Sequence, residues 1–171
     1  MSSSKGRFCY WDSNIFLAYI NQEPGRVGTI DSLWEEIEKE NGGKVVTSTV
    51  SIVEVAAAAQ ERIQKQLDAQ AELKIDGMWQ DPTVLLVESP EVVMRIARKL
   101  IRDALPAGWR LHPKDAIHLA TAVWVDRNVH SVTEFHTYDG KLAKFNAMTG
   151  LTICEPNIAQ PRLLPPGSDT S

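Results

Sequence analysis

Five short apolar segments, rich in β-branched and aromatic residues, recur along this 171-residue chain, and stretches with helical periodicity separate them. Segments of this length and composition are typical of buried strands, whereas apolar residues three and four positions apart are typical of helices. Strands that alternate with helices are joined by crossovers, which favour a parallel sheet covered on both faces. The sequence therefore predicts an α/β domain with a mostly parallel, five-stranded sheet, its strands within residues 8–12, 44–48, 83–87, 131–138 and 151–154.

Capping residues and helix breakers divide the rest of the chain into predicted helices. Ser13 and Asn14 are predicted to cap the first helix, and two glycines end the second. The stretch 51–79 has a polar centre, so we predict two helices joined by a bend. The predicted helices after the first cover about residues 30–40, 51–79 (as two helices), 89–104, 114–127 and 140–148.

The composition is that of one ordinary globular domain. Hydrophobic residues make up 43% of the chain. A domain near this size buries roughly two-thirds of its unfolded surface, so folding needs neither a disulfide nor a metal. Residues 1–7 are predicted to form a flexible tail, residues 8–156 the single folded domain, and residues 157–171 an irregular proline-rich tail.

Charge and cysteine content restrict the function classes. The net charge is −4, which argues against a protein that coats phosphates with a broad basic surface. Cys9 and Cys154 are too few for a disulfide framework, and we predict two buried free thiols, as in a reducing cytosol. The chain begins without a signal-peptide pattern and has no apolar run of about 18 residues, so a cytoplasmic protein without membrane contact is predicted.

Four acidic residues stand apart from those on charged helix faces. Asp12 ends the first predicted strand, and Asp139 ends the fourth. Glu54 and Asp115 are each predicted to lie in the first turn of a helix. The carboxyl ends of parallel strands and the helix starts that follow share one edge, where ligands bind. Four carboxylates gathered there require a counter-charge, and oxygen ligands favour Mg²⁺ or Mn²⁺.

Each of these acids also has an ordinary structural interpretation. Asp12 could be only an N-cap, and Ser51 with Glu54 has the spacing of a capping box. Asp115 would be favourable at any helix start, and Asp139 followed by Gly140 is a common turn pair. The metal-site hypothesis therefore depends on the set of four.

Four short motifs resemble those of the PIN-domain family. Asp12-Ser-Asn follows an apolar strand, and Glu54 lies in a helix that follows a Thr/Ser-rich segment. Asp115-Ala-Ile-His-Leu-Ala resembles the third motif, and Thr137-Tyr-Asp139 resembles the fourth. Their order and spacing agree with the family from Phe8 to about Cys154.

This resemblance implies a three-layer α/β/α sandwich and hydrolysis of RNA phosphodiester bonds with Mg²⁺ or Mn²⁺. It assigns metal binding to Asp12, Glu54, Asp115 and Asp139, with Ser13, Asn14 and Thr137 as supporting polar residues. Many bacterial members are VapC toxins of VapBC toxin–antitoxin pairs, so a cognate antitoxin and a homodimer are also implied. The segment 60–79 is longer and more polar than in short toxins, and the proline-rich tail is additional; both weaken the toxin assignment.

Several other residues are candidates for RNA contact or support of the site. Basic residues near the acids would steer a phosphate: Arg110, Lys114, Lys141 and Lys144. His118 shares a helical face with Asp115 and is interpreted as a hydrogen-bonding neighbour of the site. The basic face at 95–102 is interpreted as solvated surface, with phosphate contact as the alternative. Trp109 is the one tryptophan in a position to stack on a base.

Three other functions are alternatives. A PIN-like interaction module would keep the fold without catalysis, and a PIN nuclease outside toxin–antitoxin systems would keep the chemistry. A phosphoaspartate hydrolase would need an acid at Asn14. Nucleotide-binding folds are disfavoured because their glycine-rich motifs are absent from the sequence. DNA stays open as a substrate, since no residue selects RNA.

Overall fold

The computed structural model describes residues 6–158, and most of each predicted tail lies outside this range. The strands are β1 (Phe8–Trp11), β2 (Lys44–Ser48), β3 (Val84–Val87), β4 (Val132–His136) and β5 (Ile153–Cys154). They form one sheet in the order β3-β2-β1-β4-β5, and every pair is parallel. The predicted five-stranded sheet is therefore confirmed, and β1 lies at its centre.

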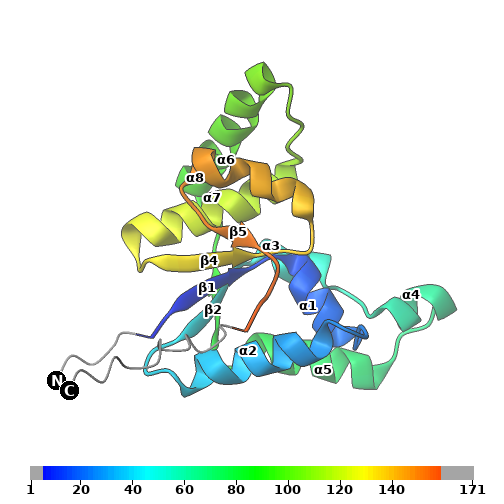
Figure 1. Cartoon of the computed structure of the whole chain (residues 1–171). Helices are drawn as coiled ribbons and strands as arrows, with labels where there is room; N and C mark the ends of the chain where they lie inside the picture. Colours follow the sequence, from blue (N-terminus) through cyan, green and yellow to red (C-terminus); the bar gives the residue numbers. More distant parts are fainter. Residues whose placement is uncertain (1–5, 159–171) are drawn as a thin grey trace, which may run out of the picture.

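Helices cover both faces of this sheet (Figure 1). Helices α6 (Glu91–Ala104) and α7 (Pro113–Asn128) pack on one face, while α1 (Ser13–Ile20), α2 (Val27–Lys39) and α5 (Ala69–Gln80) pack on the other. Successive side chains of a strand point to opposite faces. Tyr10 accordingly joins the core beneath α6 and α7, whereas Cys9 and Trp11 join the core beneath α1 and α2. The result is the predicted three-layer α/β/α sandwich.

Helix α7 contributes more buried residues than any other described helix or strand. Eight of its residues are buried, because it packs against α6 as well as against the sheet. Burying a Leu or Val side chain contributes about 1.5–3 kcal/mol, so this helix is a major source of stability. It carries Asp115 and His118, which places both residues on a rigid support.

The stretch 51–79 differs from the prediction. It forms three helices rather than two: α3 (Val50–Glu54), α4 (Ala59–Gln64) and α5. Lys65, with φ of 54°, ends α4 in the left-handed region. Glu54 is the last residue of α3 and not a first-turn residue. The capping-box interpretation is also wrong, because Thr49 precedes the helix and Ser51 lies inside it, bonded to Thr47.

The last third of the domain is more irregular than predicted. β4 ends at His136, so Asp139 lies beyond the strand and caps η2, a 3₁₀ segment (Gly140–Phe145). The short helix α8 (Asn146–Thr149) follows η2, and another 3₁₀ turn, η1 (Leu105–Ala107), follows α6. Among the described residues, no helix is long and apolar enough to cross a membrane.

Candidate active site

Asp12 lies where the central strand passes into α1. Its side chain is 5% exposed, and its Oδ1 accepts a hydrogen bond of 2.7 Å from the backbone N–H of Ser13. Asp12 is therefore the N-cap of α1, as its structural interpretation from the sequence predicted, whereas Ser13 and Asn14 lie inside the helix. Oδ2 accepts bonds from Asn14 Nδ2 (3.1 Å) and Thr137 Oγ1 (2.9 Å). This carboxylate therefore caps the helix and is also held in one position by hydrogen bonds.

A network between the start of α1 and the segment after β4 holds that carboxylate. Asn14 Nδ2 also donates to Thr137 Oγ1 (2.9 Å), and Asn14 Oδ1 accepts from the backbone N–H of Tyr138 (3.1 Å). Thr137 Oγ1 accepts from the backbone N–H of Asp139 (3.0 Å). The structure thus brings together Asp12, the three residues interpreted as its support, and Asp139.

Glu54 projects from the end of α3 toward α7. Its Oε2 lies 2.6 Å from His118 Nε2, and its Oε1 lies 2.9 Å from Lys114 Nζ. Burial alone would raise the pKa of Glu54, but the hydrogen bonds from His118 and Lys114 outweigh burial and hold this pKa at about 2. The carboxylate is therefore firmly ionised. The same bond to Glu54 raises the pKa of Lys114.

His118 connects Glu54 to the core. It is completely buried, and its Nδ1 lies 2.8 Å from the hydroxyl of Tyr10. That hydroxyl accepts a bond from the backbone N–H of Ser48, so its own proton is free to go to Nδ1. The hydrogen-bond network then assigns the proton of a neutral ring to Nε2, which donates to Glu54. Tyr10 has no local sequence signal for this role, because only the fold places it beside His118.

Asp115 and Asp139 form the anionic part of the site. Both are half-buried and line one hollow, into which the first turn of α7 and the start of η2 project. Burial raises the pKa of Asp115, and the charges of Asp12 and Asp139 raise it further. Within residues 6–158, the Asp115 carboxylate has no salt bridge and no side-chain hydrogen bond.

This arrangement suits a hard divalent cation. The charges of Asp12 and Asp139 both oppose ionisation of Asp115, whereas Glu54 is already paired with Lys114 and hydrogen-bonded to His118. Ligand atoms of Asp12, Glu54 and His118 also lie within 4.8 Å of one another. A cation between Asp12, Asp115 and Asp139 would relieve their repulsion, and carboxylate oxygens are the ligands that Mg²⁺ and Mn²⁺ prefer.

The basic residues divide into two groups. Arg110, Lys141 and Lys144 line the same hollow as Asp115 and Asp139, whereas Lys114 is paired with Glu54. Lys144 also lies over the ring of Trp109, with Nζ 5.7 Å from the ring centre. Trp109 packs edge-on against Phe145. On the basic face of α6, Arg95 pairs with Glu91 and Lys99 pairs with Asp103, as expected of a solvated surface.

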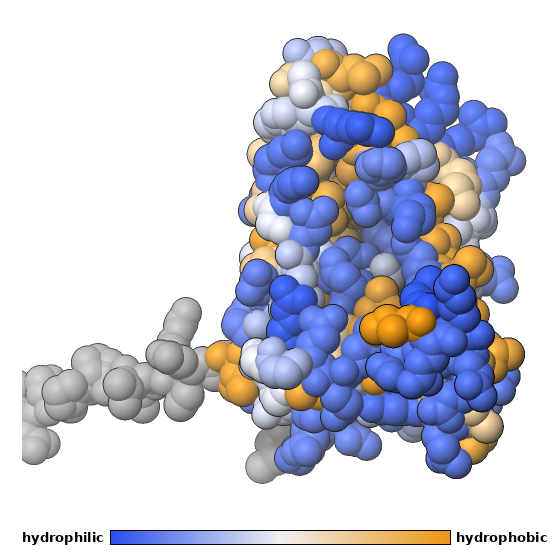
Figure 2. All heavy atoms as spheres, turned by 90° about the vertical axis from the view of Figure 1, so that its right-hand side faces the viewer, coloured by the Kyte–Doolittle hydropathy of each residue, from blue (hydrophilic) through white to orange (hydrophobic). Residues whose placement is uncertain are grey.

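Figure 2 looks onto the side of the molecule at which the strands end. Hydrophilic residues cover most of this face, and apolar residues appear among them singly or in small groups. The acids and the basic residues of the hollow come from elements that end or begin on this side. The face thus combines a partly buried anionic centre with exposed cations beside it.

Comparisons with known proteins point to one family. The model of the PIN domain family matches residues 9–147, a range that contains all four acids. A chain in the structure of VapBC2 from Rickettsia felis, bound to a DNA fragment from their promoter, is 16% identical, with a TM-score of 0.61 over 85% of this chain and 96% of that chain. No curated protein matches the chain.

Two further solved structures share the fold. VapC20 from Mycobacterium tuberculosis, a toxin that cleaves the sarcin–ricin loop, is 16% identical, with a TM-score of 0.56 over 80% of this chain and 93% of that chain. FitAcB from Neisseria gonorrhoeae is 14% identical, with a TM-score of 0.55 over 86% and 97%. The family match extends from β1 into α8 and covers most of the residues that the structure describes. The chain therefore belongs to the PIN domain family.

Proposed function

We propose that this chain is a Mg²⁺- or Mn²⁺-dependent endoribonuclease and the toxin of a VapBC-like toxin–antitoxin pair. The observation that carries the proposal is that Asp115 and Asp139 line one hollow, where burial and the charges of Asp12 and Asp139 raise the pKa of Asp115. Acids that destabilise one another on a rigid helix, at a strand end and at the start of a 3₁₀ segment are expected where a cation binds. The family membership and the three structural relatives support the same function.

In this proposal Asp12, Asp115 and Asp139 hold the cation. When bound, the cation would supply a Lewis acid that stabilises phosphate charge and lowers the pKa of a water molecule at the scissile bond. Glu54 contributes ionised charge at the inner edge of the site, held in place by His118 and Lys114. Thr137 and Asn14 orient Asp12, so the carboxylate need not reorganise when substrate binds.

The RNA backbone would approach through the hollow beside α7 and η2. Arg110, Lys141 and Lys144 line this hollow next to the acids, and they would bind phosphates on either side of the cleaved bond. A few local cations are enough for this purpose, which reconciles RNA binding with the net charge of −4.

The test is cleavage of labelled single-stranded RNA by the purified chain with Mn²⁺, with Mg²⁺ and with EDTA. We expect cutting that requires metal and is lost in Asp12→Asn and in Asp115→Asn. The matched control is Asp31→Asn, an acid on exposed α2 surface, which should cut like wild type. Cleavage that survives Asp12→Asn would contradict the assignment. Absence of both cleavage and Mn²⁺ binding would leave the interaction module. A single-stranded DNA of the same sequence tests the preference for RNA.

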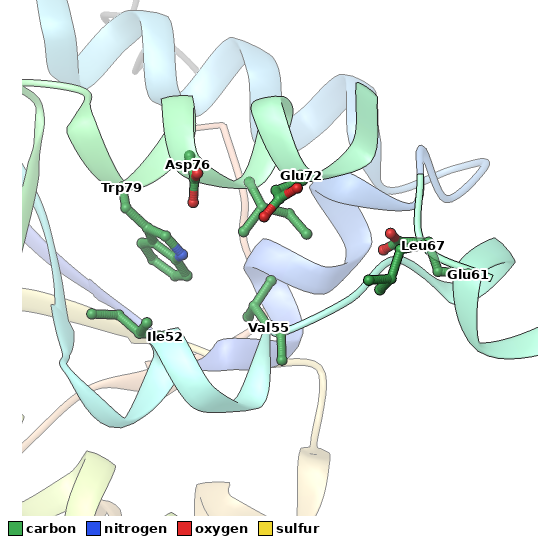
Figure 3. Close-up of a pocket in the computed structure, with 9 residues that line it drawn as sticks. Ile52, Val55, Glu61, Leu67, Glu72, Asp76 and Trp79 are labelled. Atoms are coloured by element: carbon green, nitrogen blue, oxygen red, sulfur yellow. The ribbon is translucent and has the colours of Figure 1, made fainter. Parts of the chain in front are cut away.

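A groove next to α3 is our candidate for antitoxin docking. It encloses about 190 Å³ between α3, α4 and α5, and Ile52 and Val55 of α3 face Trp79 of α5 across it. Figure 3 shows Glu72 and Asp76 at its rim and the Trp79 indole nitrogen turned toward its centre. That nitrogen is buried and has no hydrogen-bond partner among the described residues. The groove thus suits an apolar side chain that is flanked by basic residues and followed by a free carbonyl.

The protein encoded beside this chain's gene is the partner to test. Co-purification should be lost with Ile52→Glu, because Ile52 is 43% exposed at the groove. Val129→Glu is the matched control, since Val129 is 53% exposed at the end of α7. Equal retention of the partner by both variants would rule out the groove. The implied homodimer is tested by sedimentation of the purified chain alone.

A further inference from the structure

A second group of metal-ligating side chains lies on the α1/α2 face of the sheet, at the β4–β5 edge. Glu134, His136 and Cys154 offer one carboxylate oxygen, one ring nitrogen and one sulfur, and these atoms lie within 4.8 Å of one another. The parallel register produces the group. Residues two apart on β4 share a face, and His136 is the register partner of Cys154.

The polar atoms of this group are only partly satisfied by the protein. His136 is completely buried, and its Nε2 lies 2.7 Å from Glu134 Oε2. Its Nδ1 is buried and has no hydrogen-bond partner in the described part of the chain. A buried imidazole with one unpaired nitrogen carries an uncompensated desolvation cost. The hydrogen bond to Glu134 therefore satisfies only one of the two ring nitrogens of His136.

The thiol has the surroundings of a metal ligand. Asn157 directs its side-chain N–H at Cys154 Sγ, with the two atoms 3.7 Å apart, and such a donor would stabilise a thiolate. A bound cation would displace the proton of this thiol.

We propose that Glu134, His136 and Cys154 form a second metal site, which takes a borderline-soft cation of the Zn²⁺ class and is separate from the acidic site. Carboxylate, imidazole and thiolate are the three ligand types that Zn²⁺ uses in proteins, and three of them leave a fourth position for water. Mg²⁺ does not fit this donor set, because it requires a shell of oxygen ligands. One carboxylate and one thiolate would balance the charge of a divalent cation.

The site would hold the strand ends that carry the nuclease residues. The backbone carbonyl of His136 accepts the N–H of Asp12 (3.0 Å), and the carbonyl of Cys154 accepts the N–H of Thr137 (3.0 Å). β5 consists of only two residues at the edge of the sheet, so few backbone bonds attach it. A cation bound by residues of both β4 and β5 would stabilise the pairing of these strands. It would thereby hold the backbone carbonyls to which Asp12 and Thr137 are hydrogen-bonded.

The experiment is a titration of the full-length, metal-free chain with Co²⁺, followed by Zn²⁺ competition. A cysteine thiolate bound to Co²⁺ gives an ultraviolet charge-transfer band, which oxygen ligands of the acidic site do not give. We expect this band in wild type and in the Asp12→Asn/Asp115→Asn double variant, and we expect Zn²⁺ but not excess Mg²⁺ to abolish it. The readout does not depend on RNA cleavage, so it stands or falls independently of the proposed nuclease.

Cys154→Ser should remove the band, while Cys9→Ala should keep it. Cys9 is the matched control because it lies on the same face and is the register partner of Glu134, but its Sγ contacts Thr133 Oγ1. His136→Gln should weaken Co²⁺ binding at least about tenfold. Zn²⁺ should also raise the Tm of wild type but not that of Cys154→Ser. A band that survives Cys154→Ser, or no band in wild type, would overturn the proposal.

Discussion

Thr137 Oγ1 donates a hydrogen bond of 2.9 Å to Asp12 Oδ2, although the two residues are 125 positions apart. The bond exists because β4 pairs directly with β1, so the residues that follow these strands meet. The same hydroxyl accepts bonds from Asn14 and from the backbone of Asp139. One buried side chain thus joins the start of α1 to the segment that follows β4.

Replacing Thr137 with Val should loosen this junction. The change keeps the shape of the side chain but leaves the Asp12 carboxylate and two donors with one partner fewer. We expect a loss of about 1–3 kcal/mol of unfolding free energy and metal binding weaker by roughly 10–100-fold. Urea denaturation and Mn²⁺ calorimetry measure the two effects. Thr137→Ser retains the hydroxyl and should stay near wild type, so equal behaviour of the two variants would exclude the role of this bond.

Asp115→Asn should stabilise the metal-free protein while it abolishes metal binding. The pKa of Asp115 is raised by burial, Asp12 and Asp139, so its ionised form is disfavoured in the folded state at neutral pH. Removing the charge should raise the Tm in EDTA by roughly 1–3 °C. Added Mn²⁺ should raise the Tm of wild type but leave this variant unchanged. A lower Tm in EDTA would show that Asp115 has stabilising contacts instead.

The stability contributed by Glu54 should depend on acid pH. Its folded pKa is about 2, below the ordinary value of 4.5. A lowered pKa contributes stability that is complete above about pH 4.5 and is lost as the pH falls toward 2. Wild type should therefore exceed Glu54→Gln by on the order of 3 kcal/mol near neutral pH. Urea titrations in EDTA should show this difference constant between about pH 6 and 8 and shrinking below about pH 4.5. A difference that grows in acid would contradict the assignment.

Tyr10→Phe should destabilise the domain without removing any acid from the site. The hydroxyl is buried between the backbone N–H of Ser48 and His118 Nδ1, and its removal leaves both without that partner. The expected cost is about 1–3 kcal/mol in unfolding free energy. The freed His118 ring should also lose its fixed tautomer, which the ring-nitrogen chemical shifts of labelled protein report. Tyr19→Phe, on α1, is the control, and unchanged His118 shifts would contradict the network.

Lys141→Gln and Lys144→Gln should weaken RNA binding without altering metal affinity. Both residues are exposed and line the hollow with Asp115 and Asp139. For single strands, each phosphate contact adds about 0.7 to the slope of log K against log salt. Each substitution should reduce the slope by about this amount in fluorescence anisotropy with uncleavable RNA. Lys39→Gln on α2 is the control, and an equal effect there would indicate non-specific charge attraction.

Much of the fold follows from local sequence patterns. The apolar segments gave the five strands, and the boundaries of β2 are those predicted. The stretch 51–79 was less predictable, because its division into α3, α4 and α5 depends on a left-handed Lys65 and on burial of Ile75 and Met78 against α1. Local patterns describe such packing poorly, since it depends on residues far away in the chain.

The residues of the candidate site divide in the same way. The positions of Asp12 and Asp115 at element boundaries can be read from the chain, because caps and helix starts have local signatures. The partners of Glu54 cannot be predicted from local sequence. The local pattern indicates a capping box, whereas in the structure the side chain contacts His118 and Lys114. The packing of α3 against α7 determines which residues Glu54 contacts.

The sequence by itself determined the fold class, the parallel sheet and the family, because hydrophobic periodicity and short motifs are properties of neighbouring residues. The tertiary structure alone decided the order β3-β2-β1-β4-β5, and with it which side chains meet. This order joins Thr137 to Asp12 and places Cys154 beside His136. Strand pairing and register bring residues that are distant in the sequence into contact. Register is fixed by the packing of the whole core rather than by any one segment.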